Sequence, residues 1–242
     1  MLPGMDGTGE LFAPLIARLG HAVHCVVVRY PDAAVGYEAL IAHARRALPA
    51  SGDFFLLGES FSGPVAIALA AEAPERLRGL ILSATFVRNP LGWTSPLAPL
   101  VRVLPVTGAA ASLMTGLILG PFSTPLLRAT IAASLGQMSA LTIRARLRAI
   151  AAVDASENLA AVGVPIVYLR AEHDLVVPQS AARLIARLKP ETRLLNVNAP
   201  HFLLQVAVDE GASAIEGFMN GIMTGAAKPT GAKEHGQHPF VD

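Results

Sequence analysis

The sequence of 242 residues predicts an α/β fold, in which a mostly parallel sheet is flanked by helices and interrupted by one helical insertion. Short apolar runs alternate with helical patterns, which is typical of a parallel sheet covered by helices. The alternation stops over residues 89–150, where proline, glycine, alanine and leucine dominate, and then resumes. We therefore expect a core of residues 1–88 and 151–223, a helical cap or lid of residues 89–150, and a disordered tail of residues 224–242.

The first core segment contains three predicted helices and three predicted strands. Runs rich in valine, leucine, isoleucine and phenylalanine mark the strands. Apolar residues at helical spacing mark the helices, and Pro64 is tolerated because it falls in a first helical turn. In chain order, we expect a helix at 10–19, a strand at 24–29, a helix at 37–48, a strand at 53–57, a helix at 64–73 and a strand at 79–84.

The second core segment repeats the alternation on a smaller scale. It predicts a strand at 165–170, a helix at 179–188, a strand at 192–197 and a final helix at 210–219. The tail beyond this helix is polar and rich in glycine, proline, lysine and histidine, which predicts disorder.

The composition limits the function classes. The chain is 52% hydrophobic and 15% charged, which is unusually apolar for a soluble protein. The net charge is +1, with acids and bases interspersed, so nothing indicates binding to nucleic acid. The single cysteine, Cys25, excludes an intramolecular disulfide and is interpreted as a small buried hydrophobe. The first residues do not resemble a signal peptide, so we expect a cytoplasmic protein.

The uncharged stretch at residues 103–127 has three interpretations: a transmembrane helix, a plain structural insertion, or a lid over a pocket. Prolines and glycines break the stretch too often for a membrane span, so we expect none. The lid is favoured because the segment lies between two strands whose ends would carry catalytic residues.

The hexapeptide Gly58-Glu59-Ser60-Phe61-Ser62-Gly63 is the most informative motif. It follows an apolar strand and precedes a helix, so it places Ser60 on a sharp strand-to-helix turn. Such a turn exposes one hydroxyl above the sheet and needs small residues two positions before and after it. Ser62 occupies the position of the second glycine in the pattern Gly-x-Ser-x-Gly, and Gly63 follows one residue late.

A serine hydroxyl needs a base and an orienting carboxylate before it becomes a good nucleophile. Among the seven histidines, His201 follows the strand at 192–197, and its loop opens at the same sheet edge as Ser60. Asp174 follows the strand at 165–170 and so lies at that edge too. Other acids are less well placed: Glu172 is the alternative, and Asp154 is more remote.

An oxyanion hole needs backbone N–H groups aimed at the developing negative charge. The amide of Phe61, directly after Ser60, is the first candidate. The segment Pro3-Gly4-Met5-Asp6-Gly7-Thr8-Gly9 offers a second, the amide of Met5, because its glycines permit close backbone approach. A phosphate-binding loop is the competing interpretation, but the segment lacks the Gly-Lys-Ser/Thr ending.

With these motifs, residues 1–220 resemble the α/β-hydrolase superfamily. The order Ser60, Asp174, His201 is that superfamily's order of nucleophile, acid and base. The segment from Pro3 to Gly9 looks like the oxyanion loop of members with Pro-Gly in place of His-Gly, and similar loops occur in plastid esterase and acyltransferase relatives that handle phytyl and glyceride esters. The insertion from Asn89 sits where the superfamily carries its cap.

One feature departs from this resemblance. Relatives have two or three strands before the oxyanion loop, whereas only Met1 and Leu2 precede it here. The strand expected between those at 24–29 and 53–57 is therefore nearly absent. This predicts either a start that is shortened relative to the natural form or a sheet that is repaired by other means, because a gap would expose backbone N–H and C=O groups.

The resemblance implies a serine carboxylesterase that needs no metal or organic cofactor and acts on a small-molecule ester. An acyltransferase with the same triad is the alternative, and a non-catalytic protein or one that associates weakly with a membrane surface is a third hypothesis. Apolar residues of the insertion and beside His201 suggest an apolar acyl or alcohol group: Trp93, Met114, Leu117, Phe122 and Phe202.

Overall fold

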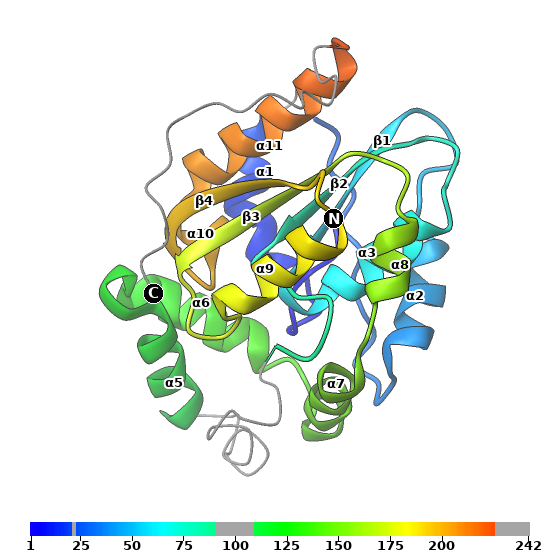
Figure 1. The fold of residues 1–242 in the computed structure, drawn as a ribbon. Helices are drawn as coiled ribbons and strands as arrows, with labels where there is room; N and C mark the ends of the chain where they lie inside the picture. Colours follow the sequence, from blue (N-terminus) through cyan, green and yellow to red (C-terminus); the bar gives the residue numbers. More distant parts are fainter. Residues whose placement is uncertain (21–22, 91–108, 226–242) are drawn as a thin grey trace.

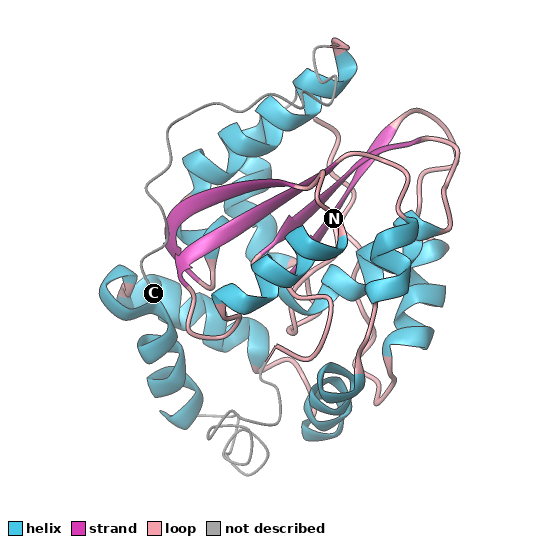
Figure 2. Cartoon of the chain, in the orientation of Figure 1, coloured by secondary structure: helices cyan, strands magenta, loops and turns pink. Residues whose placement is uncertain are grey.

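The computed structural model describes residues 1–20, 23–90 and 109–225. Trp93 and the tail from residue 226 lie outside the described residues. Within these ranges the fold is the predicted one: a parallel sheet lies in the middle of the molecule and helices flank it (Figure 1, Figure 2).

Four parallel strands form the sheet in the order β1-β2-β3-β4. They are β1 (Phe54–Glu59), β2 (Leu77–Ser83), β3 (Ile166–His173) and β4 (Arg193–Pro200). All four correspond to predicted strands. The strands β1, β3 and β4 each run two or three residues past the predicted end, so the residue that follows each strand stands at the carboxyl edge of the sheet.

Helices cover both faces of the sheet and its carboxyl edge (Figure 1). One face carries α1 and α11, and the other carries α2, α3, α8 and α9. The helix bounds are η1 (Glu10–Phe12), α1 (Ala13–Leu19), α2 (Tyr37–Arg45), η3 (Ser60–Ser62), α3 (Gly63–Ala71), α5 (Ala109–Leu119), η4 (Gly120–Phe122), α6 (Pro125–Leu135), α7 (Ala140–Ala152), α8 (Ser156–Ala161), α9 (Gln179–Leu188), α10 (Leu203–Val206) and α11 (Val208–Met223).

The core explains why β2 and the first half of β3 are almost continuously apolar. Successive residues of a strand point to opposite faces, and both faces of this sheet are covered. In β2, Leu80 and Leu82 pack into the cluster beneath α3, whereas Ile81 packs into the cluster beneath α11. In β3, Tyr168 and Val167 divide between the same two clusters. A strand with two buried faces has no polar alternation, as the sequence indicated.

The predicted strand at 24–29 is wrong, because this extended segment has almost no strand to pair with. Its neighbour consists of Met1 and Leu2 alone. The Val28 N–H donates to the Met1 carbonyl (3.0 Å), and Leu2 forms an isolated parallel bridge to Gly58. Two residues are too short for a ladder, but they fill the place between the extended segment and β1.

The described part of the insertion is helical, as predicted, and comprises α5, η4, α6 and α7 (Figure 1). These elements lie beyond the carboxyl edge of the sheet, between β2 and β3 in the chain. Within the described ranges, no single helix has the length and apolar character to cross a membrane, and one bent pair, α6 with α7, meets the criteria only when its two helices are combined.

Candidate active site

Three polar side chains follow three strands of the sheet directly. Ser60 comes after the last residue of β1, Asp174 after β3 and His201 after β4. Because the strands are parallel, their carboxyl ends meet at one edge. The sheet therefore brings together residues that lie up to 141 positions apart in the chain.

The three side chains form one hydrogen-bonded row. Ser60 Oγ lies 2.8 Å from His201 Nε2. On the other side of the ring, His201 Nδ1 lies 2.9 and 3.0 Å from the two Asp174 oxygens. Asp174 is held in turn, because its Oδ1 accepts 2.8 Å hydrogen bonds from the Val176 and Val177 N–H groups. A hydroxyl, an imidazole and a fixed carboxylate in this order can perform nucleophilic chemistry.

The backbone at Ser60 is strained. Its φ of +48° lies in the left-handed region, which a residue with a side chain rarely adopts. The Thr85 hydroxyl, two residues after β2, donates to the Ser60 carbonyl, and the Tyr37 hydroxyl donates to the Phe61 carbonyl (2.9 Å). Side chains from two other elements thus hold the turn in a conformation that exposes the Ser60 hydroxyl.

The structure explains why the second glycine of the hexapeptide stands at position 63 and not at position 62. A Cβ built on Gly63 would lie 1.9 Å from Thr85 Oγ1, so the residue at position 63 has no room for a side chain. Ser62, in contrast, is fully buried and uses its hydroxyl: it donates to the Pro3 carbonyl and accepts from the Tyr30 hydroxyl (2.7 Å). Serine at position 62 therefore joins the turn to the segment predicted as an oxyanion loop.

Replacing Gly63 with alanine is expected to lower the free energy of unfolding by about 2 to 3 kcal/mol, through overpacking and loss of the Thr85 hydrogen bond. Urea denaturation measures the change. Gly217→Ala on α11 is the matched control, since a Cβ there meets nothing within 4 Å. That variant should be neutral or more stable by up to ~1 kcal/mol. Equal stability of the two variants would contradict this account.

The loop at residues 3–9 runs beside the turn and has its carbonyls fixed one after another. The Pro3 carbonyl accepts from Ser62, and the Gly4 carbonyl accepts from the Gly7 N–H (3.1 Å). The Met5 carbonyl accepts from the Arg146 guanidinium. In a planar trans peptide the Met5 N–H points opposite to the Gly4 carbonyl, and therefore away from the Gly4–Gly7 turn. Within the described residues, this N–H has no hydrogen-bond acceptor.

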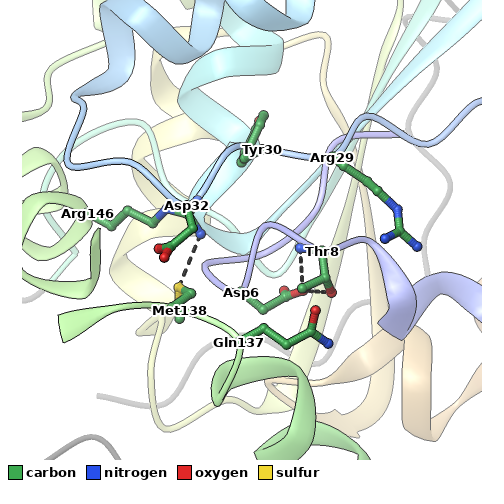
Figure 3. Close-up of a pocket in the computed structure, with 8 residues that line it drawn as sticks. All are labelled: Asp6, Thr8, Arg29, Tyr30, Asp32, Gln137, Met138 and Arg146. Atoms are coloured by element: carbon green, nitrogen blue, oxygen red, sulfur yellow. Dashed lines mark hydrogen bonds between the residues drawn. The ribbon is translucent and has the colours of Figure 1, made fainter. Parts of the chain in front are cut away.

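Asp6 ties the same loop to the insertion. Its buried carboxylate accepts from the Thr8 N–H (2.9 Å), from the Thr8 hydroxyl (2.5 Å) and from the Ser134 hydroxyl of α6 (3.0 Å). The aspartate and threonine of the loop motif thus close an internal turn (Figure 3), and Ser134 of the insertion completes the network.

A comparison with known protein families identifies the family of this chain. The family described as serine aminopeptidase, S33, matches residues 21–201, which is most of the chain. The chain belongs to this family of α/β-hydrolases. Membership in this family makes a hydrolase-type enzyme the general expectation for the chain.

Similar proteins agree with the family assignment. Phytyl ester synthase 1, chloroplastic, from Arabidopsis thaliana is 32% identical over 114 residues, which make up 43% of this chain and 16% of that protein. The fold is shared with a lipase-esterase related protein from Clostridium acetobutylicum (TM-score 0.74, 16% identity, 90% and 92% of the two chains). It is also shared with a hydrolase from Oleispira antarctica (TM-score 0.76, 13% identity, 90% and 88% of the two chains).

The imidazole of this S33-type α/β-hydrolase has an altered basicity. Burial alone lowers the pKa of His201, but the charge and hydrogen bond of Asp174 raise it, with a smaller contribution from Glu59. The net effect is a pKa above the ordinary value for histidine. Stabilisation of the imidazolium is the property that a base needs when it takes a proton from Ser60.

Glu59, beside Ser60, is a buried carboxyl group. Burial raises its pKa to about 7, the nearby Asp6 charge adds to the increase, and Gln205 and His201 oppose it. Gln205 Nε2 donates to Glu59 Oε1 (3.0 Å), while Gln205 Oε1 has no partner among the described residues.

We expect the stability of the protein to depend on Glu59 between pH 4.5 and about 7. A carboxyl group with a raised pKa stabilises the fold when protonated, and this contribution disappears as the pH rises through the folded-state pKa. The free energy of unfolding of the wild type, relative to Glu59→Gln, should fall by about 2 to 3 kcal/mol from pH 4.5 to pH 8. Urea denaturation across this range tests it. Parallel pH profiles for the two proteins would show that Glu59 does not titrate there.

Of the predicted pocket residues, two lie beside histidine rings and two lie on the protein surface. Phe202 packs edge-on against the His201 ring (5.7 Å between centroids), and Phe122 contacts the His173 ring (5.6 Å). Met114 and Leu117 point outward on α5, with exposed fractions of 39% and 61%. The inward face of α5 carries other residues, so the structure does not bring these two to the Ser60 side chain.

Two cavities lie beside the insertion, and one of them includes Asp174 in its lining. One, of about 380 Å³, lies between the insertion and the sheet edge and is lined by apolar residues of the α5–η4 junction, by Asp174 and its neighbours, and by Pro200. The other, of about 130 Å³, lies between the loop at residues 3–9 and the insertion (Figure 3). The alternative acid Glu172 lines the larger cavity. In the described part of the chain, no group of three or more histidine, cysteine or acidic residues could hold a metal ion.

The sequence prediction missed several residues that support the site. Arg146 lies in the segment Arg144-Ala145-Arg146-Leu147-Arg148, in which three arginines look alike. Arg144 and Arg148 are exposed as such a pattern suggests, whereas Arg146 is buried. Ser134 and Gln205 also carried no local signal, because their partners lie more than 120 positions away.

Proposed function

We propose that the protein is a serine carboxylesterase that hydrolyses esters with an apolar acyl or alcohol group. The observation that carries the proposal is the row of Ser60, His201 and Asp174 at one sheet edge, with Ser60 on a strained turn. Family membership and the similarity to an ester synthase support it.

The proposed mechanism begins with attack of Ser60 Oγ on the ester carbonyl, while His201 Nε2 takes the hydroxyl proton. Asp174 holds the ring and stabilises the imidazolium. The Met5 and Phe61 amides are proposed to bind the oxyanion. His201 then gives the proton to the leaving alcohol, which leaves an acyl group on Ser60. Water, activated by His201, cleaves this acyl-enzyme and restores the serine.

In this proposal the insertion acts as the cap. Its helices stand over the sheet edge that carries Ser60, and together with the residues around Asp174 they line the larger cavity. The apolar lining from Ile118 to Pro121 suits a hydrocarbon group of the substrate.

An acyltransferase is the second candidate, and the similarity to phytyl ester synthase 1 favours it. The chemistry is the same up to the acyl-enzyme, after which an alcohol replaces water. The test is a series of p-nitrophenyl esters of rising acyl length, assayed with and without a long-chain alcohol. Faster turnover of apolar esters, with free acid as product, supports the esterase, and a new ester formed from the added alcohol supports the acyltransferase. Turnover of none of these esters would contradict both.

A further inference from the structure

The most unusual buried side chain outside the Ser60 row is Arg146 of α7, which is 1% exposed. Its guanidinium donates to the Met5 carbonyl, to the Pro31 carbonyl (3.2 Å) and to Met138 Sδ (3.2 Å). Its pKa is lowered by burial, and the nearby Asp6, Tyr30 and Asp32 oppose that decrease. Among the described residues it forms no ion pair within 4 Å.

The guanidinium lies beside both residues whose amides are the predicted oxyanion donors, Met5 and Phe61. On one side it holds the Met5 carbonyl. On the other, its central carbon is 5.8 Å from the centre of the Phe61 ring and 5.8 Å from that of Tyr30. The loop is shaped around it, because a Cβ on Gly7 would lie 2.6 Å from one guanidinium nitrogen. Figure 3 shows Arg146 reaching from the insertion towards the same cavity as Tyr30 and Asp6.

The burial of this cation is costly if its only role is to fill space. A buried charge without an ionic partner is unfavourable, and an apolar side chain of similar volume often packs as well or better. One of its nitrogens, Nε, has no partner in the described residues. What Arg146 provides beyond packing is a fixed contact from α7 to the two residues whose amides are proposed to bind the oxyanion.

We propose that Arg146 is a positioning residue that links the placement of the insertion to the geometry of the oxyanion hole. The proposal rests on the esterase function above. The Gly4 carbonyl is already fixed by Gly7 and the Pro3 carbonyl by Ser62, so Arg146 supplies the third anchor, at Met5. Without it, the Met5–Asp6 peptide, which directly follows the peptide that carries the Met5 N–H, loses its anchor, so the loop at Met5 can shift and move this N–H away from the substrate oxygen.

The expected effect is on the transition state and not on substrate binding. A misplaced oxyanion donor lowers kcat, and loss of one donor costs about 100- to 1,000-fold in enzymes of this type. Arg146→Met, which removes the charge but keeps much of the length, should lower kcat by roughly 10- to 100-fold with little change in KM. Arg146→Lys, which keeps one donor, should fall between this variant and the wild type.

The experiment compares these variants with Arg144→Met and Arg148→Met, exposed arginines of the same helix that should match the wild type. Besides kcat and KM, it measures inhibition by a trifluoromethyl ketone, which forms a tetrahedral oxyanion adduct. The inhibition constant should weaken by the same factor as kcat, and thermal unfolding checks that each variant is folded.

The outcomes separate this proposal from the proposed function. A folded Arg146→Met or Arg146→Lys with wild-type kcat and inhibition would overturn the positioning role and leave the esterase intact. A rise in KM with unchanged kcat would overturn it as well, in favour of a substrate contact. Absence of ester turnover in the wild type and in the two control variants would overturn both.

Discussion

Replacing Ser60 with alanine is expected to lower kcat for ester hydrolysis by about 10⁵- to 10⁶-fold. The variant loses the atom that His201 Nε2 contacts at 2.8 Å, so no acyl-enzyme forms. Only the weak catalysis that the oxyanion hole and substrate binding provide without a nucleophile is left. Steady-state turnover of the best p-nitrophenyl ester measures the loss.

Two controls make the Ser60 result interpretable. Ser180→Ala, an exposed serine of α9, should retain wild-type activity. Thermal unfolding should show that Ser60→Ala is folded, since alanine keeps the Cβ and removes only the hydroxyl. If Ser60→Ala retained a tenth or more of the wild-type kcat, Ser60 would not be the nucleophile.

Asp174→Asn is expected to lower kcat by about 10⁴-fold while leaving the fold intact. The carboxylate accepts one hydrogen bond from His201 Nδ1–H and two from backbone N–H groups, and an asparagine amide cannot satisfy all of them. The ring would then adopt the wrong tautomer and could not accept the Ser60 proton.

The pH dependence of kcat/KM in Asp174→Asn is also predicted. Asp174 raises the pKa of His201, and only the neutral imidazole acts as a base. Loss of the carboxylate should therefore move the acid limb of the kcat/KM profile to lower pH, even though the plateau falls. Asp154→Asn, a surface carboxylate paired with Arg88, is the control and should change neither the plateau nor the limb. An acid limb that stayed in place in Asp174→Asn would mean that the limb reports another group.

The sequence predicted the elements that repeat a local pattern. β1, β2 and the first half of β3 contain apolar runs, and the polar residues after β1, β3 and β4 stand at the sheet edge whatever the exact strand end. The prediction of Ser60, Asp174 and His201 depended on this edge and not on boundaries, so the longer strands did not disturb it.

What the sequence did not predict depends on distant partners. The segment at 24–29 has strand composition, but a ladder needs a neighbour, and its neighbour is two residues long. Arg146 resembles its exposed neighbours Arg144 and Arg148, and only packing against the loop at residues 3–9 distinguishes it. No local pattern encodes either contact.

The position of the second glycine in the hexapeptide also depends on residues that are distant in the sequence. The hexapeptide departs from Gly-x-Ser-x-Gly, and the reason for the departure lies in three residues outside the motif. Thr85 leaves no room for a side chain at Gly63, and Pro3 and Tyr30 engage the hydroxyl of Ser62.

The central claim, that Ser60 is an activated nucleophile, is tested most directly by labelling with a fluorophosphonate and locating the adduct by mass spectrometry. Trypsin releases residues 47–76 as one peptide, which contains Ser51, Ser60 and Ser62, so fragment ions distinguish the three serines. We expect one adduct, on Ser60, that forms quickly in the wild type, slowly in Asp174→Asn and not in Ser60→Ala. An unlabelled wild-type protein, or an adduct on Ser51 or Ser62, would contradict the claim.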